Sequence, residues 1–350
     1  MSLKLAPIPS EREDERSEIA PYRIVAYPAD YTLEGLHQKW KAKDIVIPTL
    51  QRHYVWTLLQ ASRLIESFLL GLPVPGIFFY KAKETEKLLV IDGQQRLRSV
   101  FAYFEGKMPE SDKPFALKGV KDVWEGKSFT ELSKQEQMRL RDSVLRATIV
   151  DQLDPKDNSS IFHIFERLNT GGTSLKPQEV RNCIYSGPFN DLLLKLNKDS
   201  TWRRLMGAKQ PDKRMRDVEL ILRFLALFEW GQRYFKPMKT FLSDYMKENN
   251  SPGQERLAEL ANLFKSTTRS IEDSLPPKPF HVFAGLNAAV YDSVMVAFAA
   301  SRGKIPSKIK SRFKRLISNR AFISHVSDST TDVEIVRKRI ALAKAKLFGN

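Results

Sequence analysis

A ten-residue stretch carries the strongest chemical signal in the chain: Val90-Ile91-Asp92-Gly93-Gln94-Gln95-Arg96-Leu97-Arg98-Ser99. An apolar segment runs into a polar turn, and the apolar residues Leu97, Val100, Phe101 and Phe104 then recur at helical spacing up to Gly106. The polar turn is therefore predicted to lie at the N-terminus of a helix. Free backbone N–H groups and the helix dipole favour an anion there, most often phosphate.

The side chains of this turn suit phosphate chemistry. Gly93 allows a ligand to approach the backbone closely. Arg96 and Arg98 carry guanidinium forks that match phosphate oxygens. Asp92 can hold a metal ion or a water molecule, and the two glutamines that follow Gly93 can orient that water. A capped helix with solvated polar residues explains the same pattern equally well.

A second polar cluster, with Gln51, Arg52 and Trp56, comes just before another predicted helix that ends at Gly71. The apolar residues of this helix fit helical spacing, and Arg52 can reach the same phosphate pocket. A surface ion pair beside the aromatic rings of Tyr54 and Trp56 is the alternative. A third cluster, Asn169-Thr170-Gly171-Gly172, either closes the site or only ends a helix. A further helix begins near Pro177, where we expect Glu179 and Arg181 to be solvated.

The strands and helices predicted around these polar clusters form an α+β unit. Short strands are expected at 45–48, 77–80, 88–91 and 147–150, with helices between them. Residues 1–29 contain four prolines and a charge cluster and are expected to form a flexible arm. Residues 30–185 form the predicted α+β domain and residues 186–350 an all-α domain. The helices expected in the second domain include 218–230, 237–249, 254–274, 280–300, 307–318 and 332–348.

The charge predicts a polyanionic partner. The chain has 57 Lys and Arg against 41 Asp and Glu, a net charge of +16, which favours nucleic acid over a membrane surface. An amphipathic helix near residue 310 has a one-sided basic face, expected to grip DNA phosphates through Lys308, Lys310, Arg312, Lys314 and Arg315. A solvated lysine-rich face is the alternative.

Several classes of protein are excluded by what the sequence lacks. It has no P-loop and no G-x-G-x-x-G after a strand, and its five histidines are scattered. One cysteine, Cys183, rules out an internal disulfide framework and fits a reducing compartment. With no apolar leader and no apolar run long enough to span a bilayer, we expect a cytoplasmic protein with no membrane partner.

Four motifs in this order resemble the N-terminal domain of GmrSD-type, modification-dependent (type IV) restriction endonucleases. The resemblance covers residues 30–185, and the segment 216–224 looks like the family's helical continuation. The motifs are Pro48-x-x-Gln51-Arg52-x-x-Val55-Trp56, Glu66-Ser67 with Gly71-x-Pro73, Asp92-Gly93-Gln94-Gln95-Arg96, and Phe165 to Gly172 with Gln178-Glu179.

The resemblance implies a fold similar to ParB and sulfiredoxin, with nucleoside triphosphate (NTP) binding and hydrolysis in an anti-phage setting. Family members often carry or pair with an HNH-like nuclease domain, which is not found in these 350 residues. A separate HNH nuclease subunit is therefore an expected partner, together with DNA that carries phage modifications.

The leading hypothesis is an NTP-hydrolysing DNA-sensing subunit. In it Asp92, Gln95 and Arg96 are catalytic, and Asp92 also holds Mg²⁺. The remaining site residues bind the nucleotide: Gln51, Arg52, Trp56, Gly93, Gln94, Arg98, Asn169, Thr170, Gly171 and Gly172. A non-catalytic DNA-binding module and a ParB-like nuclease acting alone are the alternatives. The preferred nucleotide and the formation of a homo-oligomer stay open.

Overall fold

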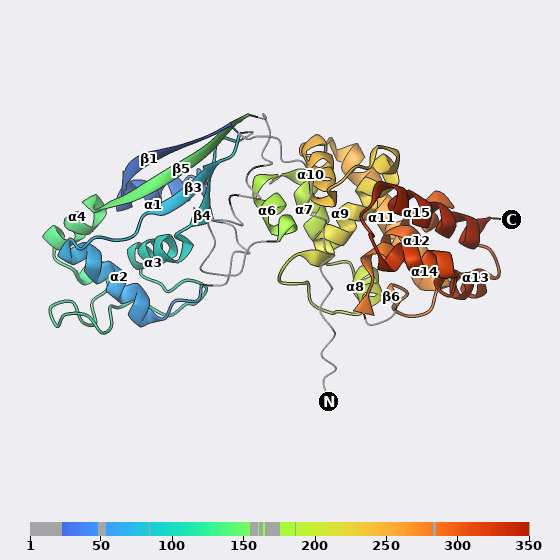
Figure 1. The fold of residues 1–350 in the computed structure, drawn as a ribbon. Coiled ribbons are helices and arrows are strands. Elements are labelled where there is room, and N and C mark those ends of the chain that lie inside the picture. Colours follow the sequence, from blue (N-terminus) through green and yellow to red (C-terminus); the bar gives the residue numbers. More distant parts are fainter. Residues whose placement is uncertain are drawn as a thin grey trace. The chain divides into compact units, whose positions relative to one another are not determined.

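The computed structural model describes residues 23–47, 54–83, 85–154, 160, 164, 176–185, 187–282 and 285–349. These residues fall into two compact units, which divide between Ile184 and Tyr185 (Figure 1). The first unit is α+β and contains the Asp92 turn, whereas the second is mostly helical. Both features agree with the fold class predicted from the sequence.

A five-stranded mixed sheet forms the centre of the first unit, in the order β1-β5-β3-β4-β2. Strand β1 pairs antiparallel with β5 and β3 with β4, while β2 lies parallel to β4 and β3 parallel to β5. The strands are β1 (Arg23–Thr32), β2 (Ile45–Val46), β3 (Ile77–Lys81), β4 (Leu88–Asp92) and β5 (Val144–Asp154). The short strands predicted near 45, 77 and 88 are confirmed.

Helices α1 (Leu33–Lys41), α2 (Leu58–Leu70), α3 (Gln94–Glu105) and α4 (Lys134–Asp142) complete the first unit together with the 3₁₀ turn η1 (Phe129–Glu131) and α6 (Pro177–Ile184). Leu97, Val100 and Phe101 of α3 are buried in one core with residues of α1, α2 and strands β3 to β5. Gly106 ends α3 and Gly71 ends α2, both in the left-handed conformation, as the periodic patterns predicted.

The sequence-based prediction of a flexible arm is wrong for residues 23–29, which belong to β1. This strand lies at the edge of the sheet and is held by pairing with β5, for example between Ala29 and Ala147. Most of its side chains are exposed and Pro28 lies within it, so it lacks the alternation of buried and exposed side chains that marks many strands. Proline is tolerated at a sheet edge because one side of an edge strand needs no ladder hydrogen bonds.

Helix α6 also differs from the expectation, because Glu179 and Arg181 are buried rather than solvated. The Glu179 carboxylate accepts a hydrogen bond from the backbone N–H of Lys176 at 2.5 Å, just before the helix begins. The Arg181 guanidinium donates to the side-chain oxygen of Gln178 at 2.9 Å. One carboxylate oxygen of Glu179 and the guanidinium of Arg181 thus have partners nearby in the chain, although the sequence alone would place both side chains in water.

The second unit consists mainly of helices, as predicted. They are α7 (Pro188–Leu196), α8 (Ser200–Met206), α9 (Arg216–Trp230), η2 (Gly231–Arg233), α10 (Met238–Glu248), α11 (Gln254–Ser274), α12 (Ala288–Ala300), α13 (Ile309–Ile317), α14 (Arg320–Ser327) and α15 (Val333–Phe348). The helix predicted from residue 280 is too long, because two short antiparallel strands precede α12: β6 (His281–Val282) and β7 (Gly285–Leu286). Asn287 then caps α12 by accepting the N–H of Val290.

A buried charge cluster joins three helices of the second unit. Asp292 of α12 accepts hydrogen bonds from Arg223 of α9 at 2.6 Å and from Arg339 of α15 at 2.9 Å. Arg339 also donates to the carbonyl oxygen of Ala289 at 2.6 Å. Because all three charged side chains are buried, each depends on the others for compensation of its charge.

Among the described residues, no helix is both long enough and apolar enough to cross a bilayer.

The turn between β4 and α3 packs directly on strand β3. Gly93 has φ of 93°, and a Cβ atom added there would lie 2.3 Å from Cγ2 of Ile77. The turn therefore needs glycine for its backbone conformation and for this close packing. The sequence-based reason for Gly93, close approach to a ligand, is not needed to explain the residue.

We predict that Gly93→Ala lowers the free energy of unfolding by roughly 3 kcal/mol or more, since left-handed strain and a steric clash act together. Gly106→Ala is the matched control: its φ is 76°, but no atom lies within 4 Å of the added Cβ. That change should cost about 1 kcal/mol. Denaturant unfolding of both variants measures the difference, and equal losses would contradict the packing argument.

Candidate functional site

Asp92 and Arg96 form an ion pair across the first turn of α3, with Oδ2 and Nη2 2.7 Å apart. The other terminal nitrogen of Arg96 donates to the carbonyl oxygens of Pro75 and Gly76 at 2.6 and 2.7 Å. The Arg96 side chain is only 15% exposed, whereas that of Asp92 is 43% exposed. Arg96 thus ties α3 to the loop before β3, and Asp92 presents a carboxylate to solvent.

Gln95 joins the first two polar clusters. Its side-chain oxygen accepts hydrogen bonds from the backbone N–H groups of Val55 and Trp56 at 3.1 and 3.4 Å. These contacts bring the Trp56 segment next to the Asp92 turn, and a shared nucleotide site of the two stays a prediction. Gln95 holds backbone in this arrangement, and orientation of a catalytic water by Gln95 stays a prediction. The neighbouring Gln94 is buried.

Arg98 is held by the protein on two sides. Its guanidinium lies 2.7 Å from the carboxylate of Glu110 and 5.7 Å from the centre of the Tyr54 ring. The Tyr54 hydroxyl lies 2.7 Å from that of Ser99. Burial raises the pKa of Tyr54, while the Ser99 hydrogen bond and the Arg98 charge oppose the rise. Tyr54 is therefore neutral at physiological pH, and its ring packs against the Arg98 guanidinium.

Glu110 was not identified from the sequence. It is one glutamate in a loop, twelve positions after Arg98, and no short-range pattern links it to α3. The structure shows that Glu110 has a backbone φ of 58° and contacts both Arg98 and Tyr54.

Six predicted nucleotide-binding residues lie outside the described residues: Gln51, Arg52, Asn169, Thr170, Gly171 and Gly172. Their contribution to the site stays a prediction.

A metal ion at Asp92 would depend on ligands beyond the protein side chains described. Within the described ranges, no group of three or more His, Cys, Asp or Glu side chains could hold a metal. Mg²⁺ usually keeps several water molecules and binds through one or two carboxylates together with substrate phosphates. Asp92 fits such a role because it is half exposed beside the start of α3.

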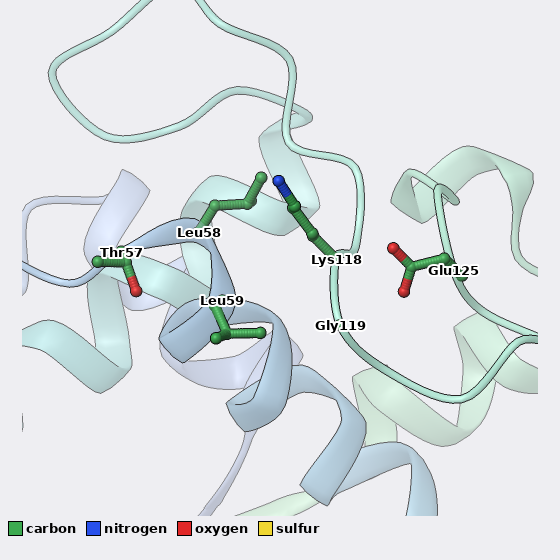
Figure 2. Close-up of a pocket in the computed structure, with 6 residues that line it drawn as sticks. All are labelled: Thr57, Leu58, Leu59, Lys118, Gly119 and Glu125. Atoms are coloured by element: carbon green, nitrogen blue, oxygen red, sulfur yellow. The ribbon is translucent and has the colours of Figure 1, made fainter.

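A surface depression of about 610 Å³ lies where α2 begins, against the loop at residues 118–125 (Figure 2). It is lined by Thr57, Leu58, Leu59, Lys118, Gly119 and Glu125. Two side chains of α2 hold this loop: Ser62 accepts the N–H of Lys118 and Glu66 accepts that of Lys121. The sequence did not predict the depression because these contacts are about 55 positions apart along the chain.

The basic helix α13 has the predicted amphipathic character. Ile309, Phe313 and Leu316 are buried, and the exposed residues include Lys308, Lys310, Lys314 and Arg315. Arg312 differs, because its guanidinium donates to the carbonyl oxygens of Leu347 and Gly349 at 3.1 and 2.6 Å. This arginine therefore fastens α13 to the end of α15, which leaves the other four as the stronger candidates for DNA contact.

The excess charge is concentrated in the second unit. Residues 185–350 contain 30 Lys and Arg against 16 Asp and Glu, which accounts for +14 of the total +16. Residues 1–184 together are therefore nearly balanced, and any attraction of a polyanion is greatest at the helical unit.

The first unit is an α+β domain in which two polar motifs meet at the start of one helix. Residues 33–186 of the chain match the family model described as GmrSD restriction endonuclease, N-terminal domain. This segment is therefore similar to the N-terminal domain of that restriction endonuclease family, as its motifs indicated. No curated protein matches the chain.

We predict that Arg96→Ala lowers the free energy of unfolding by about 2 kcal/mol, because it removes charge-assisted hydrogen bonds that join α3 to the loop before β3. Asp92→Ala should have a smaller effect, since Arg96 keeps both carbonyl contacts. Urea unfolding followed by tryptophan fluorescence compares the two variants. A wild-type value for Arg96→Ala would show that the carbonyl contacts add nothing to stability.

Proposed function

We propose that the chain is an NTP-hydrolysing, DNA-sensing subunit of a modification-dependent restriction system. The observation that carries this proposal is the meeting of the Trp56 segment and the Asp92 turn at the N-terminus of α3. The family match supports the restriction setting. A separate HNH nuclease subunit would supply the cleavage activity.

The proposed nucleotide site lies at the start of α3, where the helix dipole favours phosphate. Asp92 would hold Mg²⁺, and Arg96 would fix the orientation of the Asp92 carboxylate through their 2.7 Å contact. Mg²⁺ would neutralise charge on the phosphates during hydrolysis. Trp56 offers a half-buried aromatic surface next to this turn, connected to it by Gln95.

The proposed DNA surface is the exposed basic face of α13. Its cations have no acidic residue within their own helix, and its apolar side is buried, so the charges face outward. Contacts of this kind bind the phosphate backbone without reading the base sequence. Recognition of a modified base would require another part of the complex.

One observation favours a second function, DNA binding without hydrolysis. Gln95, Arg96 and Arg98 all have partners within the protein, so the motif residues have structural roles that need no nucleotide. In this alternative, the Asp92 turn maintains the fold of the first unit, and the second unit binds DNA.

We predict that Asp92→Ala reduces NTP hydrolysis by about 100-fold or more, because it removes the carboxylate that would hold Mg²⁺. Release of radiolabelled phosphate from each of the four common NTPs measures the rate. Asp112→Ala is the matched control, since Asp112 is a fully exposed carboxylate of the same unit. Equal release from wild type and Asp92→Ala would remove the hydrolysis proposal and favour the DNA-binding alternative.

We further predict that replacing Lys310, Lys314 and Arg315 with Gln makes DNA binding less dependent on salt. Each phosphate neutralised contributes about −0.9 to the slope of log affinity against log salt concentration on duplex DNA. The slope should therefore become shallower by roughly two to three units. Titrations of fluorescently labelled duplex DNA at several salt concentrations measure it.

The control for this experiment removes the same charge elsewhere. Lys195, Lys247 and Lys265 are exposed on α7, α10 and α11, and their replacement with Gln should change the slope much less. If both triple variants behave alike, the net charge of the unit attracts DNA and α13 has no special role.

A further inference from the structure

The segment from Tyr54 to Thr57, which leads into α2, is held in an unusual way. It belongs to no strand, yet each of its four backbone N–H groups donates to a side-chain oxygen. Tyr54 donates to Glu110 at 3.2 Å, Val55 and Trp56 donate to Gln95, and Thr57 donates to Gln60 at 2.9 Å. Four consecutive donors are thus satisfied by three side chains.

Two of these acceptors have simple explanations. Gln60 completes a capping box with Thr57 at the start of α2, which depends only on local sequence. Gln95 belongs to the motif at the start of α3. Glu110 is different, because it comes from a loop and contacts both the segment and α3.

Glu110 connects three parts of the chain through one carboxylate oxygen. This oxygen accepts the Tyr54 N–H at 3.2 Å and a hydrogen bond from Arg98 at 2.7 Å. Arg98 in turn lies against the ring of Tyr54. The loop that carries Glu110 is itself fixed, since Met108 donates to the carbonyl of Lys113 and Phe115 to that of Gly106.

This arrangement determines where Trp56 lies. The segment has no neighbouring strand to hold its donors, so its position depends on the acceptor side chains. Glu110 holds its first residue and Gln95 holds the next two, including Trp56. Loss of the first contact would free the end of the segment nearest the Gln51-Arg52 motif in the sequence.

We propose that Glu110 is a positioning residue for the nucleotide site: it fixes the Tyr54–Thr57 segment and the Arg98 guanidinium, and thereby orients Trp56 beside the Asp92 turn. This role rests on the proposed function. Glu110 acts through Arg98 and through the backbone of Tyr54, at a distance from the reacting phosphate. Its loss therefore affects nucleotide binding more than the chemical step.

The experiment compares wild type with Glu110→Ala, Glu110→Gln and Asp112→Ala in the full chain. The Gln variant keeps a side-chain oxygen that can accept from Tyr54 and Arg98. Asp112 lies in the same loop and pairs only weakly with Lys107, at 3.7 Å, so its variant controls for loss of a loop carboxylate. Hydrogen exchange of peptides covering residues 54–57, measured by mass spectrometry, reports on the segment without any nucleotide.

In Glu110→Ala we expect exchange of the segment to be roughly three- to tenfold faster, since one hydrogen bond is lost. The KM for the hydrolysed NTP should rise by about the same factor with little change in kcat. Glu110→Gln and Asp112→Ala should stay close to wild type in both measurements. Rescue by Gln is the result that a simple loss of folding in the Ala variant would not produce.

The possible failures are distinct. Unchanged exchange in Glu110→Ala would overturn the contact between Glu110 and the segment. Faster exchange with an unchanged KM would overturn the positioning role, although the proposed function would stand. If the wild-type chain hydrolyses no NTP, the proposed function fails first, and the role of Glu110 at a nucleotide site fails with it.

Discussion

The backbone of Gly93 lies so close to Ile77 that no side chain fits between them, and the rest of the candidate site depends on this contact. This contact packs the turn between β4 and α3 against β3. Arg96 then secures the junction from the other end, through the carbonyl oxygens of Pro75 and Gly76. The polar motif is therefore first a structural joint between a helix and two strands. The proposed chemistry would use the groups that stay exposed at this junction, above all the Asp92 carboxylate.

Much of the fold could be predicted from the sequence because its helices have regular apolar faces and clear end signals. Helix α3 shows this best: its buried residues recur at helical spacing between two glycines. Strand β1 could not be predicted in the same way, because its side chains are mostly exposed and its stability comes from pairing with β5, more than 110 positions away. The short strands before α12 were also missed, because the apolar residues on both sides of them suggested one continuous helix.

The candidate site was predicted in outline, and its internal contacts were not. The sequence assigned Trp56 and the Asp92 turn to one nucleotide site, and in the structure Gln95 contacts the backbone of Val55 and Trp56. Residue types alone could not show which polar groups face a ligand and which are used by the fold. Arg98 and Arg312 illustrate this, because each looks like a phosphate-binding arginine but has partners within the protein. Such partners are distant in sequence and leave no periodic signal.

The four amides of the Tyr54–Thr57 segment have a consequence for the kind of ligand group that can be recognised there. All four donors already have acceptors within the protein, so the backbone of this stretch can offer a ligand only carbonyl oxygens, and that of Thr57 already accepts the N–H of Ala61. A phosphate group accepts hydrogen bonds and therefore gains nothing from carbonyl oxygens. These oxygens could instead accept a hydrogen bond from an amino group of a nucleobase. In the proposed nucleotide site, this segment and the start of α3 would therefore offer groups of opposite hydrogen-bonding polarity, one for the base of the ligand and one for its phosphates.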